Sequence, residues 1–316
     1  MTAPGGMPDV VVSGRDADAA MPIGPVASRG PWRLAWRRLR RDRWAMASLV
    51  TIVVLALVAL LAPVLTHVLG HPPNLQYRDT GLTLDGSPVA PNPTFWLGTD
   101  NLGRDVLARV LYGARISLLV GVVATGMSVL IGVVIGVIAG YVGGVVDTLL
   151  SRLIDVMLSF PFLLTAIALV SIVGPGLLVS IFVIVFFSWT GIARITRGQV
   201  LSIREKEYIE AARSLGAGPL RTMVVDVLPN LAGPLIVYAT LLVPTAIIFE
   251  ATLSFLGLSV TPPTATWGNM LSDADQYYTQ AWWFMLFPSL ALVVTTLAFN
   301  LLGDGLRDAL DPKSGL

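Results

Sequence analysis

The sequence predicts an all-α polytopic membrane protein that crosses the bilayer as six transmembrane helices and keeps both termini in the cytoplasm. Hydrophobic residues make up 54% of the 316 residues and charged residues 13%, whereas an ordinary soluble domain carries about 25% charged residues. Long apolar runs recur along the chain, each close to the ~20 residues that a membrane-spanning helix needs. Basic residues are distributed unevenly between the segments that join these runs, which predicts the orientation.

Six spans divide the basic residues between two sides. The segments expected outside hold Arg78, Arg104, Arg109 and Arg115. The other Lys and Arg residues fall on or near the opposite side, as cytoplasmic segments do. Composition also excludes some functions. The net charge of +1 provides no field for a nucleic-acid partner, and the absence of cysteine excludes thiolate metal sites. With two histidines in the chain, no metal site is expected.

The N-terminal region is expected to be an anchor. Residues 1–30 are rich in Gly, Pro, Ala and Asp, and we expect a disordered cytoplasmic tail without the apolar core of a signal peptide. A basic cluster interleaved with tryptophans follows: Trp32, Arg33, Trp36, Arg37, Arg38, Arg40, Arg41, Arg43 and Trp44. Such a cluster can bind nucleic acid, but it runs directly into the apolar residues 45–69. It is therefore interpreted as a positive-inside anchor with interfacial tryptophans.

The polar, proline-rich residues 70–115 are expected outside, so residues 31–112 combine the anchor span with an extracytoplasmic segment. Thr99 or Asp100 is a candidate N-cap. The apolar stripe after it predicts an amphipathic helix lying at the outer interface; its residues are Val106, Leu107, Val110 and Leu111.

Residues 113–308 form the main membrane domain, and 309–316 a short cytoplasmic tail. The spans are expected over about 116–139, 146–172, 176–195, 234–258 and 282–302. Gly132, Gly136 and Gly140 recur every fourth residue, which favours close helix packing; a face that slides during function is the alternative. Pro161 is expected to bend the span that contains it.

Four polar residues inside these spans are candidate site residues. Arg152 and Asp155 are three apart and could pair near the cytoplasmic end, where a structural role is favoured over a functional one. Glu250 has no neighbouring charge in the sequence, so it either lines a passage or ties helices together. Asn300 lies in the last span.

The polar residues 203–230 interrupt the apolar pattern between the fourth and fifth spans. A helix is predicted from Ile203 to Leu215, and Gly216 supplies the left-handed stop. Pro219 suits the start of a second helix, which the dipeptide Leu228-Pro229 is expected to end. The product is a compact helical elbow outside the membrane. It either docks into a partner, because alanines give it a low-profile side, or remains a solvated loop.

The spacing of the elbow residues resembles the EAA loop of ABC-importer permeases. The matching residues are Glu210, Ala211, Ala212, Gly216, Leu228 and Pro229. Asp226 stands where the family often has an apolar residue. Residues 97–121 and the strings after residue 254 resemble the peptide/nickel importer branch, specifically its C-type membrane subunit. The resemblance covers about residues 31–311 and implies the type I ABC-importer permease fold, with 113–308 as the permease domain in a bacterial inner membrane.

The resemblance implies partners and roles. A second homologous permease would form a heterodimer around the passage, two ATPase subunits or domains would grip the elbows, and an extracytoplasmic binding protein would deliver cargo. The residues implied to couple this chain to the ATPase are Glu207, Glu210, Ala211, Ala212, Gly216, Leu228 and Pro229. The cargo implied is di- or oligopeptides, with nickel, opines or glutathione as alternatives.

The chain itself is expected to be no enzyme, to have no catalytic residue and to bind no cofactor. Its lysines, Lys206 and Lys313, do not follow the glycine of a P-loop, so ATP and magnesium belong to partner subunits. An intramembrane aspartyl protease is a remote alternative with Asp155 and Asp304. However, the sequence before Asp304 lacks the first glycine of the GxGD pattern. A serine protease would need a histidine at membrane depth, and a passive channel would leave the elbow unexplained.

Overall fold

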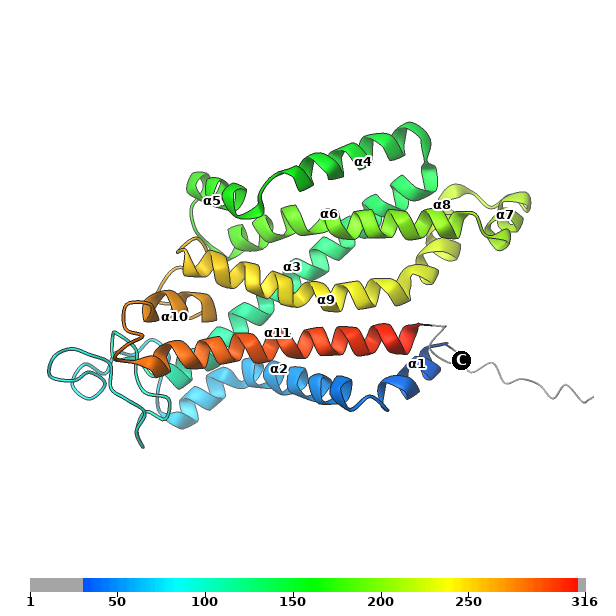
Figure 1. The fold of residues 1–316 in the computed structure, drawn as a ribbon. Helices are drawn as coiled ribbons and strands as arrows, with labels where there is room; N and C mark the ends of the chain where they lie inside the picture. Colours follow the sequence, from blue (N-terminus) through cyan, green and yellow to red (C-terminus); the bar gives the residue numbers. More distant parts are fainter. Residues whose placement is uncertain (1–30, 312–316) are drawn as a thin grey trace, which may run out of the picture.

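The structure, a computed structural model, describes residues 31–311. The tail predicted over residues 1–30, and the last part of the tail predicted over 309–316, lie outside this range. The described chain is helical and contains two isolated β-bridges in place of strands. Its helices form an elongated bundle, with a loop-rich lobe at one end and the short helices of the elbow at the other (Figure 1).

Long apolar helices make up the body of the bundle. Five helical stretches of the described residues are long and apolar enough to cross a membrane. They are α2 (Arg43–Leu69), α3 (Val106–Val142), α6 (Leu177–Arg204), the continuous stretch of α8 (Pro219–Arg221), η1 (Thr222–Val227) and α9 (Leu228–Phe255), and α11 (Trp282–Leu310). A sixth span results if the bent pair α4 (Gly144–Ser159) and α5 (Phe162–Val173) counts as one. Shorter helices are α1 (Pro31–Leu39), α7 (Glu207–Ser214) and α10 (Trp267–Ala274).

Helix α3 is the central helix and packs most extensively against α6. A Cβ atom added at Gly132 would lie 2.7 Å from the Trp189 carbonyl oxygen, and one at Gly136 would lie 2.6 Å from the Ala193 carbonyl oxygen. The two backbones can therefore approach only because glycines face α6. The predicted packing role of the glycine stripe is confirmed.

Helix α3 begins earlier than predicted. Asp105 is its N-cap and accepts a hydrogen bond from the Ala108 amide, after which the helix continues without a break to Val142. The prediction of a separate interfacial helix capped by Thr99 or Asp100 is wrong. Both residues lie buried in the preceding loop. At 1.5 Å per residue the helix is roughly 55 Å long, so it projects beyond the ~30 Å hydrocarbon core.

The predicted single span over 146–172 is a broken pair. Helices α4 and α5 meet at an angle of 86°. Phe160 is extended, as a residue before proline tends to be, and Pro161 precedes the first residue of α5. The predicted bend at Pro161 is thus confirmed, and it is sharper than a kink within one helix.

The dipeptide Leu228-Pro229 does not end a helix, which corrects the prediction. Leu228 keeps helical dihedral angles, and a π-helical turn leads from α8 into α9. Proline is tolerated in the first turn of a helix, where the backbone amide lacks an intrahelical partner. The π turn places Pro229 at such a position, so the chain remains helical from the elbow into the span.

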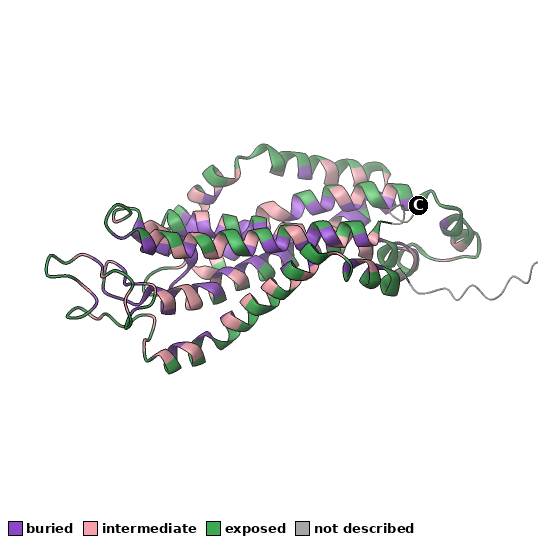
Figure 2. Ribbon diagram, turned by 60° about the horizontal axis from the view of Figure 1, so that its bottom comes forward, coloured by how far each residue is buried: buried purple, intermediate pink, exposed green. Residues whose placement is uncertain are grey.

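The distribution of buried and exposed residues agrees with a helical bundle that is surrounded by lipid. Buried residues follow the inner helix faces, while the outer helix faces are exposed and the end loops are buried only in part (Figure 2). Along the middle of α2 the exposed side chains are apolar, including Leu57, Leu60 and Val64. An apolar outer face is unfavourable in water and favourable in hydrocarbon, so α2 lies at the lipid boundary.

Candidate functional site

The elbow consists of α7, α8 and the turn between them, and it projects from one end of the bundle (Figure 1). The predicted helix from Ile203 to Leu215 is interrupted, because α6 ends at Arg204 and α7 begins at Glu207. Ile203 and Ile209 are buried, but Leu215 is 89% exposed. The break between α6 and α7 reorients α7, so its C-terminal end is presented to the outside.

Two contacts fix α7 to the bundle. Ile209 is fully buried in a cluster with Val200, Val227 and Leu231, which belong to the two spans that flank the elbow. The guanidinium of Arg213 lies over the ring of Tyr141 at the end of α3, 4.9 Å from its centroid. These contacts make the elbow a rigid extension of α3, α6 and α9.

Gly216 turns the chain at the end of α7. Its φ is +86°, and its amide donates to the Arg213 carbonyl while the Ala217 amide donates to the Ala212 carbonyl. This pattern is a glycine C-cap that satisfies the last carbonyls of the helix. No atom lies within 4 Å of a Cβ placed at Gly216. The requirement for glycine is therefore conformational and not a matter of space.

A groove of about 560 Å³ runs along the outside of the elbow. It is lined by Tyr208, Ala211, Ala212, Leu215, Gly216, Ala217, Arg221 and Asp226. Glu207 and Glu210 lie exposed in the first turn of α7, where the helix dipole favours acidic groups. Leu228 and Pro229 are exposed at the base of the elbow. A groove that combines small apolar side chains with charged ones is a surface suited to another protein.

Glu250 lies inside the bundle and ties helices together. It is fully buried on α9 and accepts hydrogen bonds from Ser117 on α3 at 3.0 Å and from Ser254 at 2.6 Å. Ser254 is also bonded to Thr266, the residue that caps α10. Of the two roles predicted for Glu250, this geometry supports the tie between helices.

The pair predicted between Arg152 and Asp155 does not form. Asp155 accepts a hydrogen bond from Arg194 on α6 at 2.7 Å, and both side chains are about half exposed. Arg152 is exposed, as is Asn300 on α11. Arg194 is the nearer partner because α4 packs along α6, which the sequence spacing could not reveal. The aspartyl protease alternative would need Asp155 to face Asp304. These residues lie on α4 and α11, and α11 packs mainly against α9 and α2.

Sequence reasoning missed a buried ion cluster in the lobe at the other end. Arg104 donates from Nε to Asp100 at 2.5 Å and lies 3.4 Å from Asp273 of α10, and the Nε of Arg109 lies 3.3 Å from Asp100. Nearby, His71 is 2.5 Å from the N-cap carboxylate of Asp105. The residues that pair in this cluster come from distant parts of the chain. Charged residues in a polar loop are not expected to be buried, so the sequence did not indicate the cluster. The cluster makes the lobe a rigid structure.

Comparison with known sequences decides the family. The sequence model described as the binding-protein-dependent transport system inner membrane component matches residues 132–315. The chain belongs to this family. A second model, the N-terminal TM domain of oligopeptide transport permease C, matches residues 30–83. The protein is therefore a multi-pass ABC-transporter permease of the bacterial inner membrane, and the predicted branch is confirmed.

Curated relatives of the permease match most of its length. It is 42% identical to the di/tripeptide transport system permease protein DppC of Pseudomonas aeruginosa, over 90% of this chain and 92% of the relative. It is 45% identical to the dipeptide permease protein DppC of Bacillus subtilis, over 88% and 85% of the two chains. It is 43% identical to the oligopeptide permease protein OppC of Escherichia coli, over 91% and 93%.

A solved structure shares the permease fold. A chain of the inward-facing MetNI methionine ABC transporter aligns with a TM-score of 0.54 and 21% identity, and it covers 65% of this chain and 96% of its own length. The predicted type I importer fold is confirmed by this likeness. About a third of this chain lies outside the part that resembles the MetNI chain.

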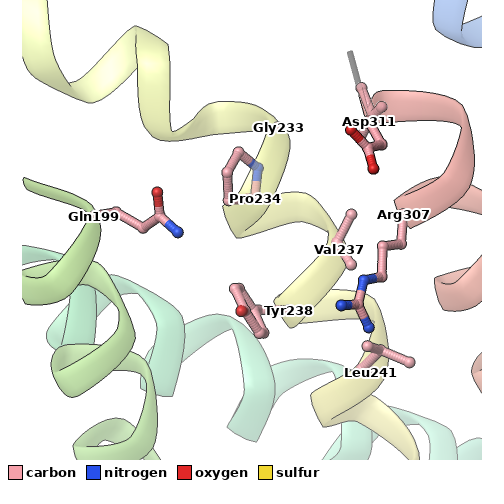
Figure 3. Close-up of a pocket in the computed structure, with 9 residues that line it drawn as sticks. Gln199, Gly233, Pro234, Val237, Tyr238, Leu241, Arg307 and Asp311 are labelled. Carbon is pink, nitrogen blue, oxygen red and sulfur yellow. The ribbon is translucent and has the colours of Figure 1, made fainter. Parts of the chain in front are cut away.

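The permease also has a pocket of about 250 Å³ between α6, α9 and α11. Figure 3 shows Gln199 and Arg307 on opposite sides of α9, with Tyr238 between them and Val237 and Leu241 beside Arg307. The pocket combines polar groups with an apolar floor at the helix ends nearest the elbow. No sequence pattern singled it out, because three helices far apart in the chain contribute to it.

Proposed function

We propose that this permease is one of two homologous membrane subunits of an ATP-driven importer of di- and oligopeptides. The relatives named for dipeptide and oligopeptide transport, at 42–45% identity over nearly the whole chain, support the cargo class. In this proposal the passage runs between the two subunits, and each subunit contributes half of its wall.

The elbow couples this subunit to an ATPase. The observation that carries this role is the combination of a rigid base and an exposed groove: Ile209 is fully buried, while Leu215 at the other end is 89% exposed. Ala211 and Ala212 keep the groove wall low, and Gly216 sets its turn. Glu207 and Glu210 offer negative charge beside the groove, and Leu228 and Pro229 lie exposed at the base of the elbow.

In this proposal the chain transmits force and catalyses no reaction. ATP and magnesium are bound by two ATPase subunits or domains, which draw together when ATP binds. A pull on α7 reaches α3 through Arg213 and Tyr141, and it reaches α6 and α9 through Ile209. Because these contacts are packed and not flexible, the spans rock between two global states, inward-open and outward-open.

The orientation and the outer partner follow from charge and shape. We infer that the elbow end, which carries most of the basic residues, is cytoplasmic. The lobe at the other end then faces outward. Its ion cluster of Asp100, Arg104, Arg109 and Asp273 keeps it rigid, which suits it for contact with a binding protein that delivers the cargo.

The polar residues on exposed helix faces are candidates for the passage. Asp155 pairs with Arg194 on an exposed face, and Arg152 and Asn300 are also exposed. A polar or charged group facing lipid is unfavourable, so these faces suit water or the second permease. Glu250 belongs to the interior and not to the passage wall.

Reconstitution tests the proposal. The permease would be co-expressed with its candidate second permease and ATPases, purified as a complex and placed in vesicles with the binding protein. We expect ATP-dependent accumulation of a labelled dipeptide that unlabelled peptides compete away and nickel does not. Accumulation of nickel without peptide uptake would show that the cargo is nickel and not peptides. Uptake of peptide without any ATPase would overturn the coupled mechanism.

A further inference from the structure

Helix α1 is a short amphipathic helix outside the span that follows it. It packs on the end of α11, where Ala35 and Leu39 are buried, and Arg38 donates to the backbone oxygen of Asp311 at 2.9 Å. Asp42 then caps α2 by accepting hydrogen bonds from the Trp44 and Ala45 amides. The helix is thus held beside the bundle at the elbow end (Figure 1).

The other faces of α1 are not used by the bundle. Trp32 is 53% exposed and Trp36 is 49% exposed, although indole rings of this size are usually buried in part against protein. At 3.6 residues per turn, the two tryptophans form one stripe, four residues apart. Arg33 and Arg37 form the next stripe, on the side turned away from the buried face, and neither makes an ion pair with the described residues.

We propose that α1 is a binding site for the anionic phospholipids of the adjacent leaflet, with the Trp32 and Trp36 indoles in the headgroup region and Arg33 and Arg37 on the lipid phosphates. Amphipathic helices with aromatic and basic stripes lie in the interface plane in this way. Tryptophan is suited to this depth because its ring is apolar and its N–H is polar.

Charge complementarity selects the occupant. Arg40, Arg41 and Arg43 extend the basic cluster to the first residue of the span, and all three are exposed. Such a cluster beside a membrane span attracts an anionic lipid surface, with about a fivefold gain in affinity per residue. A protein partner would have to bring an acidic surface into the interface of the bilayer, where α1 lies beside the start of the α2 span.

The site would act on the end of α11. Leu39 packs with Ala45, Ala309 and Leu306, and Gly305 approaches Ala45 so closely that a Cβ there would lie 2.4 Å from the alanine Cβ. Lipid that fixes α1 therefore also fixes the start of α2 and the end of α11. The permease would respond to the anionic lipid content of the membrane independently of its cargo.

A single nitroxide label tests the proposal, because the chain has no cysteine. Trp32→Cys, labelled in the full-length permease, is placed in vesicles of phosphatidylcholine alone or with added phosphatidylglycerol. Accessibility to oxygen and to a water-soluble nickel complex gives the depth of the label. We expect the label to move from water into the interface when phosphatidylglycerol is present, and to return partly to water at high salt.

Charge variants provide the control. Arg33→Gln with Arg37→Gln should lower the ratio of immersed to water-exposed label more than tenfold, because each arginine contributes about fivefold at an anionic surface. Arg78→Gln, on the outer lobe, should leave the ratio unchanged. A label that stays in water, one equally immersed without phosphatidylglycerol, or one protected only when ATPase is added would overturn the proposal. The assay needs neither cargo nor ATP, so its failure is separate from any failure of the transport assignment.

Discussion

Arg213 lies over the ring of Tyr141, with the guanidinium carbon 4.9 Å from the ring centroid and Nε donating to the tyrosine hydroxyl at 3.3 Å. The contact joins the middle of the elbow to the end of the central helix α3. It is the direct link between the groove that we propose to bind an ATPase and α3, the central helix of the bundle.

Removing this link should weaken coupling more than stability. Arg213→Ala removes a partly exposed cation–π contact, which contributes about 0.5–1 kcal/mol, so unfolding should change little. Peptide uptake per ATP hydrolysed should fall severalfold, because α7 can then tilt without moving α3. Tyr141→Phe keeps the ring and should retain most of the coupling. If Arg213→Ala transported normally, force would have to pass through Ile209 alone.

The left-handed turn at Gly216 predicts an asymmetric response to alanine. Gly216→Ala forces a φ of +86° on a residue with a Cβ and should cost about 1–2 kcal/mol locally. Uptake should therefore uncouple from ATP hydrolysis. Gly218→Ala is the matched control, because Gly218 has a φ of −69° with open space around it. Equal uptake by the two variants in reconstituted vesicles would contradict a docking role for this turn.

Glu250 predicts a stability effect that depends on hydrogen bonding. Glu250→Ala leaves a cavity and removes the partner of Ser117 and Ser254, so the thermal unfolding of the purified permease should lose about 2–4 kcal/mol. Glu250→Gln can still bond both serines and should lose far less. The two variants are compared by thermal unfolding in the same detergent. A large loss in Glu250→Gln would mean that the negative charge itself matters.

The corrected pairing of Asp155 gives a double-mutant test. Arg194→Ala and Asp155→Ala should be coupled, by less than about 1 kcal/mol in the isolated chain, because the pair is exposed. Arg152→Ala combined with Asp155→Ala should be additive, since no contact joins them. Stability is measured by chemical unfolding in micelles. Coupling to Arg152 and not to Arg194 would restore the pairing that the spacing predicted.

Asp273 predicts a pH dependence of the outer lobe. Burial raises the pKa of this carboxyl above its ordinary value of 3.8, against the opposing effect of Arg104 and Arg109, while Asp100 raises it further. An acid whose pKa is higher in the fold than in the unfolded chain binds its proton more tightly when folded. Its contribution to stability is therefore greatest at or below pH 3.8 and declines as pH rises to the raised pKa.

The measurement compares the unfolding temperature with pH in the wild type and in Asp273→Asn. The variant keeps an oxygen that can accept from Arg104 but cannot titrate, so the decline between acidic and neutral pH should be shallower. The carboxyl of Asp85 serves as a control, since its hydrogen bonds from Thr83 and Ser87 lower its pKa and give the opposite slope. An identical slope in the wild type and Asp273→Asn would rule out this assignment.

The sequence by itself determined the membrane class, the approximate spans, the packing role of the glycine stripe, and the polar composition and glycine turn of the elbow. These features are local. Each depends on a few turns of one helix: the length of an apolar run, the positive φ that Gly216 can adopt, and the recurrence of glycine at every fourth residue. The same reasoning located the bend at Pro161, because proline and its preceding residue restrict the backbone whatever surrounds them.

The tertiary structure alone decided the partners. Asp155 could have paired along its helix with Arg152, and packing against α6 brought Arg194 closer instead. Arg104 and Asp273 are 169 residues apart, and Glu250 and Ser117 are 133 apart. Buried polar groups must find partners wherever the fold brings them together, and no local pattern encodes that meeting.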